Sequence, residues 1–242
     1  MKKDLSDFTL KRYRHILKEA KKKYVLRTFN NYVDKERFLI IRHDVDCSLH
    51  RAKKMAFLEK EEGIVSTYFI HLHNEFYNLL ERAVSDCVLE IMRAGHAIGL
   101  HFDCEYYGII REDELKKYLS LEKKLLEDIF RTKISVFSFH NPTQATAVFS
   151  SESYSGMINT YSDFFRLKVA YCSDSNGYWR FGNCLEVLKK SHARLQILIH
   201  PNWWQEKYMQ PRKRIIRAIE GRARKTLKNY DALLLKHGRR NI

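Results

Sequence analysis

The stretch Phe38-Leu39-Ile40-Ile41-Arg42-His43-Asp44-Val45-Asp46 decides the fold that we expect for this chain. It begins as a continuous run of bulky apolar residues, which is typical of a strand buried on both faces of a sheet. It ends in a histidine and two aspartates. Because side chains alternate between the two faces of a strand, Asp44 and Asp46 are expected to project on the same side. Two carboxylates held so close require a cation or a shared proton, so the end of this strand is a candidate site.

A helix is predicted directly after this strand. Ser48 is expected to cap it, because a serine hydroxyl accepts a hydrogen bond from a free N–H of the first turn. Gly63 is expected to end it in the left-handed conformation. A buried strand, acidic residues at its carboxyl end and then a helix is the arrangement by which α/β enzymes present a site.

Five further apolar runs, at 64–70, 97–100, 134–139, 169–172 and 195–199, are also followed by polar residues. The polar residues that follow them are His71, His73 and Asn74; His101, Asp103 and Glu105; His140 and Asn141; Asp174, Ser175 and Asn176; and His200. Helices are predicted at about 8–23, 76–94, 112–129 and 211–236, while 143–167 gives no clear pattern. Six such strand ends in succession favour a β/α barrel, because an open doubly wound sheet would concentrate polar residues at one switch point.

Length and composition predict one domain over residues 1–242. The chain has only three prolines and nine glycines, too few for a flexible linker. Its formal charge of +15 lies at the two ends: residues 1–30 hold ten Lys/Arg against three acids, and 205–242 hold twelve against three. We expect these ends to be basic helical extensions that suit an anionic membrane surface or a phosphorylated substrate. No recognition helix or aromatic RNA-binding motif accompanies them, so nucleic acid is not the expected partner.

The same sequence features predict a cytoplasmic protein. The longest apolar runs have the length of strands, and no apolar stretch of signal-peptide length follows the basic start. The five cysteines are odd in number and show no CxxC spacing, so they are expected to be reduced. The basic ends are compatible with peripheral association with a membrane.

The polar strand ends also predict a chemistry. An aspartate with histidines or carboxylates from neighbouring strands is a normal ligand set for a divalent metal, and zinc prefers these ligands. A second aspartate can take a proton from water, and a histidine opposite it can donate one to a leaving group. These parts together suit hydrolysis of an amide or an ester.

At this point the motifs resemble those of the polysaccharide deacetylases of carbohydrate esterase family four, the nodulation-factor-deacetylase-like proteins. The resemblance runs from about Phe38 to Trp204 and is closest to an intracellular branch linked to surface-glycan biosynthesis. It rests on the segments His43-Asp44-Val45-Asp46, Gly95-His96-Ala97-Ile98-Gly99-Leu100-His101, Phe137-Ser138-Phe139-His140-Asn141-Pro142 and Leu198-Ile199-His200. The resemblance implies a distorted (β/α)₇ barrel that removes acetyl groups from sugars with a divalent metal, Zn²⁺ by preference.

By this resemblance Asp44 is the base, while Asp46 and His101 are metal ligands. The family's second ligand histidine stands four residues after the first, where this chain has Glu105; Asp103 and His140 are the alternatives for that ligand. His200 is implied as the general acid and Asp174 as the carboxylate that orients it. Leu198, Asn141 and Trp203 are assigned to substrate binding, with Trp204 as a further candidate for stacking on a sugar.

The expected function is therefore removal of N- or O-acetyl groups from a carbohydrate, a precursor in surface polysaccharide biosynthesis. Two alternatives stay open. One is a related metal hydrolase of another non-peptide C–N bond, with a pocket lined by His71, His73 and His140. The other is a catalytically degenerate barrel that acts as a binding subunit, docked through its basic ends.

Overall fold

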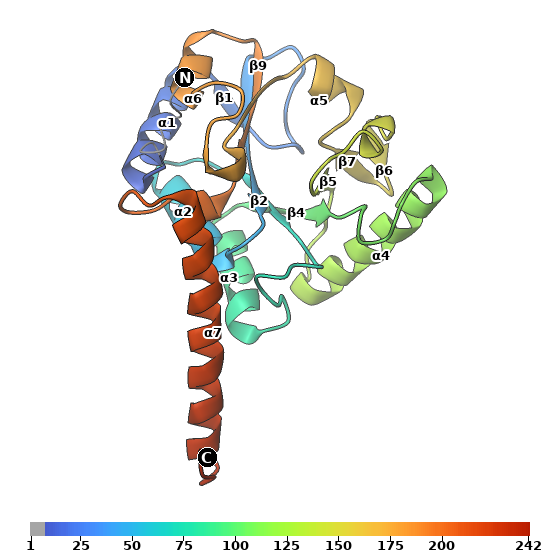
Figure 1. Cartoon of the computed structure of the whole chain (residues 1–242). Helices are drawn as coiled ribbons and strands as arrows, with labels where there is room; N and C mark the ends of the chain where they lie inside the picture. The colour runs from blue at the N-terminus through green and yellow to red at the C-terminus, as the bar shows by residue number, and fades with distance from the viewer. Residues whose placement is uncertain (1–7) are drawn as a thin grey trace.

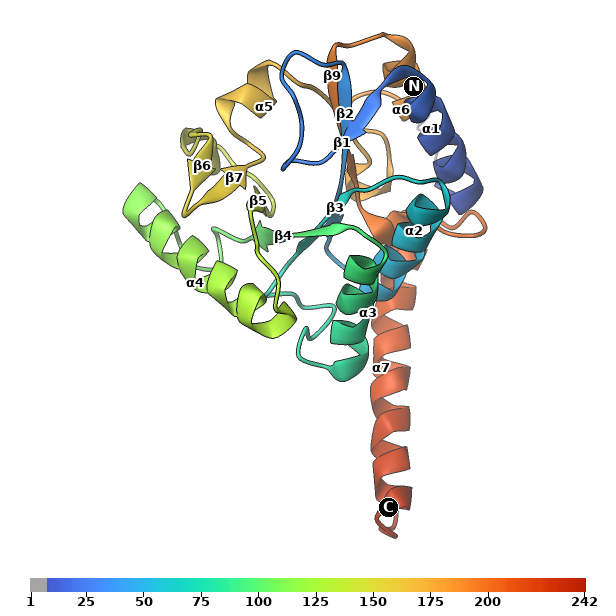
Figure 2. The same cartoon turned by 180° about the vertical axis from the view of Figure 1, so that it is seen from behind.

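The computed structural model describes residues 8–242 as an α/β protein built on one curled sheet. The strands follow the order β6-β7-β5-β4-β3-β2-β9-β8, and β1 pairs with β2 beside this path. All neighbouring pairs are parallel except β6 and β7. Helices α1 to α4 lie on the outside of the sheet (Figures 1 and 2). The distorted β/α barrel that the sequence predicts is thereby confirmed, in the form of a half-barrel.

The chain alternates between strands and helices over most of its length. The strands are β1 (Val25–Arg27), β2 (Phe38–Val45), β3 (Thr67–Ile70), β4 (Ala97–Phe102), β5 (Val136–Phe139), β6 (Ser153–Tyr154), β7 (Met157–Asn159), β8 (Ala170–Ser173) and β9 (Arg194–Ile199). The α-helices are α1 (Leu10–Lys23), α2 (Leu49–Glu61), α3 (Arg82–Arg93), α4 (Glu112–Phe130), α5 (Asp163–Leu167), α6 (Cys184–Lys189) and α7 (Pro211–Lys236). Short 3₁₀ helices are η1 (Thr146–Val148), η2 (Ser175–Gly177) and η3 (Pro201–Trp203).

Strand β2 is buried over its whole length and separates two environments. Its residues Phe38 and Ile40 pack with Phe29, Phe69 and other apolar side chains in a small cluster inside the curl of the sheet. Arg42 and Asp44 follow on this same face, because side chains alternate along a strand. The apolar cluster thus fills one end of the interior, and the polar residues occupy the end toward which the strands run.

The other face of β2 packs against the outer helices. Leu39 and Ile41 belong to an apolar cluster formed with α1, α6 and β9, and Val45 belongs to a second cluster formed with α3 and α4. These clusters fix β2 and its neighbours in register. They therefore hold the polar ends of the strands in place.

Both expected caps of α2 are confirmed, because Ser48 Oγ accepts from Arg51 N–H at 3.3 Å and Gly63 has φ +68°. Two other element boundaries differ from the sequence prediction for local reasons. The second predicted strand, 64–70, begins only at Thr67, because Ile64 N–H still bonds to the Glu59 carbonyl of α2 at 2.9 Å. The helix predicted at 76–94 begins only at Arg82, because the Asn74 side chain accepts backbone N–H groups and turns the chain.

The basic ends of the chain take different structures. Part of the first, 1–30, forms α1 and β1, while residues 1–7 lie outside the described residues. The last basic segment forms α7 with the predicted bounds, and this helix projects away from the body of the molecule (Figure 1). In the described part of the chain, none of the helices combines the length and apolarity needed to span a membrane.

Candidate metal centre and catalytic residues

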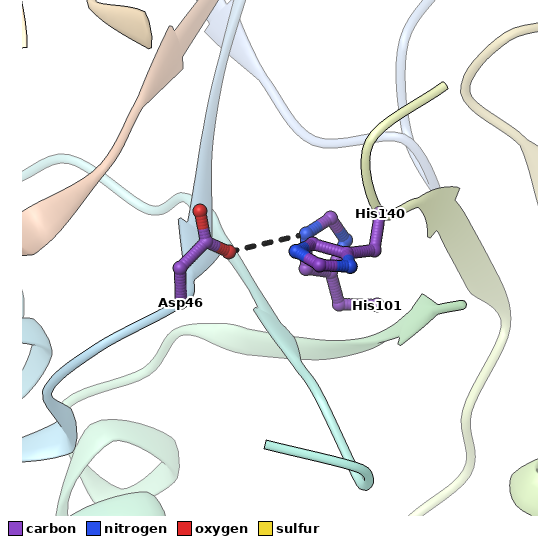
Figure 3. Close-up of side chains that lie close together, drawn as sticks. All are labelled: Asp46, His101 and His140. Carbon is purple, nitrogen blue, oxygen red and sulfur yellow. Dashed lines mark ion pairs between the residues drawn. The ribbon is translucent and has the colours of Figure 1, made fainter. Parts of the chain in front are cut away.

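Asp46, His101 and His140 come together at the carboxyl ends of three strands. Asp46 follows β2, His101 lies in β4 and His140 follows β5, and each offers a ligand atom within 4.8 Å of the others (Figure 3). Asp46 Oδ1 lies 3.2 Å from His101 Nε2 but has no hydrogen-bond partner among residues 8–242. An unpartnered buried carboxylate oxygen facing two imidazoles is the arrangement that a divalent cation would complete.

The two histidines are held by polar neighbours. Ser138 Oγ lies 2.7 Å from His101 Nδ1, so the other ring nitrogen of His101 is the one that faces Asp46. Asp103 Oδ2 lies 3.1 Å from His140 Nδ1. Hydroxyls and carboxylates that engage one ring nitrogen of a histidine fix the tautomer and orientation needed for the other nitrogen to bind a metal.

The pKa of Asp46 is lowered in this setting. Burial alone would raise it, but His101, His200 and His140 stabilise the carboxylate and bring the pKa below its ordinary range. The side chain is thus ionised at neutral pH, which is the form that binds metal.

A second group of possible ligands adjoins the first and shares His140 with it. It consists of His71, Asp103 and His140. His71 Nε2 lies 3.6 Å from Asp103 Oδ2 and has no hydrogen-bond partner in the described chain. Burial lowers the pKa of His71 to about 3, so its ring is neutral at physiological pH.

Glu105 does not join either group. Its side chain is exposed, and its backbone N–H donates to Asp103 Oδ1 at 2.9 Å in a turn after β4. Of the alternatives that the sequence left open, the structure brings His140 to Asp46 and His101, and it places Asp103 beside His140. Glu105, which the sequence also offered as a ligand, belongs to neither of the two groups.

Asp44 is held by Arg42, a residue that the sequence analysis did not single out. Arg42 Nη2 donates to Asp44 Oδ2 at 2.7 Å, and both side chains are buried. Arg42 also donates to Thr160 Oγ1 at 2.9 Å and to the Tyr161 hydroxyl at 3.2 Å. Although burial would lower the pKa of Arg42, Asp44 raises it, so the guanidinium stays charged. A signal was present: arginine stands two residues before Asp44, on the same face of an apolar strand.

Asp44 Oδ1 remains free of a hydrogen-bond partner within residues 8–242. Asp44 Oδ2 lies 3.8 Å from His101 Nε2, so Asp44 sits beside the ligand group without belonging to it. One oxygen fixed by arginine and one left open is suitable for accepting a proton.

His200 is held by Asp174, a fully buried aspartate. His200 Nδ1 lies 2.6 Å from Asp174 Oδ1, and the backbone N–H of His200 donates to both carboxylate oxygens at 2.9 and 3.0 Å. Trp204 Nε1 donates to Asp174 Oδ2 at 2.7 Å. Burial would lower the pKa of His200, but Asp174 outweighs this and raises it to about 9. The imidazole is therefore protonated at neutral pH, and its Nε2 lies 3.6 Å from Asp46 Oδ2.

One cavity of about 390 Å³ joins these groups. Its lining includes the candidate catalytic and ligand residues Asp44, Asp46, His101, His140 and His200, and the expected substrate-binding residues Leu198, Asn141 and Trp203. Asp174 lies behind His200. Trp204 is fully buried and bonded to Asp174, so it is excluded as a surface on which a sugar would stack.

Comparison with known proteins gave similar solved structures only: no family model matches the sequence, and no curated protein matches it. A variant of the peptidoglycan deacetylase PdaC from Bacillus subtilis is 9% identical, with 86% of this chain and 99% of that chain covered and a TM-score of 0.46. A family 4 carbohydrate esterase from Bacillus anthracis is 12% identical, with 88% of this chain and 86% of that chain covered and a TM-score of 0.43. The CE4 family pseudoenzyme BA3943 from the same organism is 13% identical, with 78% of this chain covered and a TM-score of 0.45. The match spans 63% of the length of BA3943. These similar structures are CE4 family proteins, the family that the sequence motifs resemble.

Proposed function

We propose that this protein is a metal-dependent hydrolase that removes N- or O-acetyl groups from a carbohydrate. One observation carries the proposal: a single cavity is lined by an Asp-His-His ligand group, an aspartate fixed by arginine and a histidine fixed by aspartate. These are a metal site, a general base and a general acid, which amide or ester hydrolysis requires together.

In the proposed mechanism the protein residues move two protons. Asp44 accepts a proton from the attacking water through the oxygen that Arg42 leaves free. His200 donates a proton to the nitrogen or oxygen of the departing sugar, and Asp174 holds the imidazolium in the necessary orientation. Leu198 lines the cavity beside them and would contact the acetyl methyl group. Asn141 and Trp203 lie on the same cavity and would contact the sugar.

The residues present fit a divalent metal. One ionised carboxylate and two imidazoles are the donor set that zinc favours, and the unpartnered Asp46 Oδ1 supplies a free ligand atom. A bound divalent ion would polarise the scissile carbonyl and lower the pKa of water. We assign Asp46, His101 and His140 as its ligands and Zn²⁺ as the preferred ion.

We propose a precursor of a surface polysaccharide as the substrate, and the cytoplasm, with peripheral contact to the membrane, as the place of reaction. All five cysteines are free and buried, which suits a reducing compartment. A precursor carried on a phosphate or a lipid phosphate would interact with the basic ends of the chain. Both points support the proposal without depending on the identity of the sugar.

Metal analysis followed by an acetate-release assay tests the proposal. We expect about one zinc per chain in the wild-type protein, and loss of both metal and acetate release in Asp46→Ala and in His101→Ala. The control His237→Ala changes an exposed histidine beyond α7 and should keep both. A wild-type protein that takes up no metal from a zinc solution would refute the mechanism. Binding of acetylated sugars that persists after chelation, with no turnover, would favour a binding subunit instead.

A second candidate function has its own support. An adjoining cavity of about 390 Å³ is lined by His71, His73 and His140, together with Asp46 and Asp103. This is the pocket expected for a metal hydrolase of another non-peptide C–N bond. Release of ammonia rather than acetate, abolished by His71→Ala but insensitive to Leu198→Phe, would select this function over deacetylation.

A further inference from the structure

A cavity outside the proposed catalytic site lies between the first turn of α2 and the first half of α7. Its volume is about 240 Å³, and it is lined by residues 47–51 on one side and by residues of α7 on the other. Figure 2 shows α7 passing beside α2 and α3. Five basic side chains and one acidic side chain line it, namely Arg51, Arg214, Arg217, Arg222, Lys225 and Glu81. The cavity is therefore strongly cationic.

The first turn of α2 presents free donors to this cavity. Ser48 Oγ accepts from Arg51 N–H, and the Ser48 carbonyl accepts from Ala52 N–H. Within residues 8–242 the backbone N–H groups of Leu49 and His50 have no acceptor outside the helix. The positive end of a helix dipole and unsatisfied N–H groups favour an anion.

Two buried side chains in the lining of this cavity also carry polar atoms without a hydrogen-bond partner in the described chain. Asn202 is 5% exposed, and neither its amide nitrogen nor its amide oxygen is hydrogen-bonded in the described chain. Arg214 is 2% exposed; it donates to the carbonyls of Met209 and Trp203, but its Nη2 has no acceptor among residues 8–242. Leaving a buried donor unsatisfied destabilises the folded state, so such groups are normally paired. Both residues line the cavity.

The cationic residues are only partly neutralised by the protein itself. Arg51 pairs with Glu206 at 2.9 Å and Arg222 donates to Glu81 at 2.6 Å. Arg217 donates to the Gln205 side chain at 2.5 Å, an uncharged partner. Lys225 has neither a hydrogen bond nor an ion pair in the part of the chain that the structure describes. An anion in this cavity would thus meet positive charge from α7, N–H donors from α2 and the free amide of Asn202.

We propose that this cavity binds a phosphate group. A phosphate supplies several strong acceptor oxygens, which match the donors of α2, Arg214 and Asn202, and its charge matches the surplus of arginine and lysine. The phosphate belongs to a small molecule or to a lipid headgroup. The binding site does not depend on the proposed deacetylase activity, because none of its donors takes part in that mechanism.

The neighbourhood of the cavity distinguishes these two sources. A second cavity of about 630 Å³ continues along α7 and is lined by Phe76, Ile219, Leu227 and Tyr230. Phe76 and Arg222 line both cavities, so an apolar chain attached to the phosphate would lie directly on this surface. An alkyl phosphate is therefore expected to bind more tightly than inorganic pyrophosphate if the natural ligand is a lipid.

Calorimetric titration of the whole chain with pyrophosphate and with decyl phosphate tests the proposal. We expect saturable binding of both in the wild type and about a tenfold weaker affinity in Asn202→Leu. Because the Asn202 side chain makes no hydrogen bond, this variant should melt at the wild-type temperature or higher without ligand. Lys225→Ala should also weaken binding, whereas the matched control Lys228→Ala, on α7 but outside the cavity, should not.

The outcomes separate cleanly. Wild-type protein that binds neither probe, or Asn202→Leu and Lys225→Ala proteins that bind both probes as the wild type does, would overturn the proposal. Binding to vesicles that contain phosphatidic acid, weakened by Asn202→Leu, would identify the lipid headgroup as the source. Vesicle binding that is reduced equally by Lys225→Ala and Lys228→Ala, with no probe binding, would instead show a general basic surface and would also overturn it.

Discussion

Replacing Asp174 by asparagine is expected to lower the pKa of His200 by two units or more. Asp174 is fully buried and is the nearest acceptor of the His200 ring, at 2.6 Å. It opposes the effect of burial and raises the pKa of His200 from 6.5 to about 9. Asparagine keeps the size of the side chain but removes the charge. Burial would then lower the pKa of His200 with less opposition from negative charge, and the imidazole would be neutral at pH 8.

The same change has a calculable effect on stability. A pKa that rises from 6.5 to about 9 on folding contributes about 3 kcal/mol of stability. Because the folded-state pKa is the higher one, this contribution is complete below pH 6.5 and is lost as the pH rises through about 9. Asp174→Asn should therefore destabilise the protein most at about pH 6, and the loss should be smallest at about pH 10.

Two measurements on metal-free protein check this reasoning. Titration of the His200 ring by NMR gives its pKa in both proteins, and urea unfolding across the pH range gives the difference in stability. Asp86→Asn, at an exposed carboxylate on α3, serves as the control and should leave both quantities unchanged. A wild-type His200 that titrates near its ordinary pKa of 6.5, or an unchanged pKa in Asp174→Asn, would refute the assigned role of Asp174.

Three other substitutions probe the scaffold around the site. Glu59 is a buried carboxylate 2.7 Å from His43 with a pKa lowered to about 2; Glu59→Gln should cost about 3 kcal/mol at neutral pH in urea unfolding. Because folding lowers the pKa of Glu59, its carboxylate stabilises the folded protein fully above the ordinary pKa of 4.5, and this stabilisation is lost as the pH falls through about 2. The free energies of unfolding of the wild type and Glu59→Gln should therefore converge in acid. Arg42→Lys removes the buried guanidinium that donates to Asp44, Thr160 and Tyr161 and should cost about 3 kcal/mol and lower acetate release at least about tenfold; wild-type turnover would contradict this. Gly99→Ala places a methyl group 2.6 Å from the Phe69 ring and should cost about 1–3 kcal/mol in thermal unfolding, whereas Gly221→Ala, with open space around it in α7, should be neutral or stabilising.

Elements with a strong local pattern were predictable from the sequence. The apolar run of β2, the caps of α2 and the stripe of α4 each encode their structure in neighbouring residues, and the bounds of α7 were predicted correctly. The polar residues at the strand ends were predictable for the same reason. Parallel strands carry their carboxyl ends to one edge, so the sequence order alone groups Asp46, His101 and His200.

Features that depend on distant partners were not predictable. The short strands β6 and β7 occupy the segment 143–167 and form only by pairing with each other and with β5. The partners of Arg42, namely Thr160 and Tyr161, come from the loop after β7. No local pattern in the sequence connects these residues, which are more than a hundred positions apart.

The third candidate ligand shows what information was missing. In the parallel pairing of β4 with β5, His101 lies opposite Ser138, so His140, two residues further along, returns to the same face. Glu105 is instead carried away, because Asp103 Oδ1 accepts the N–H groups of both Glu105 and Tyr106 and turns the chain outward. The spacing of four residues after His101 therefore ends on the surface in this chain, while a residue 39 positions later reaches the ligand group. Strand register, rather than residue spacing, selects the candidate ligand. The register between β4 and β5 follows from the packing of both strands against α3 and α4.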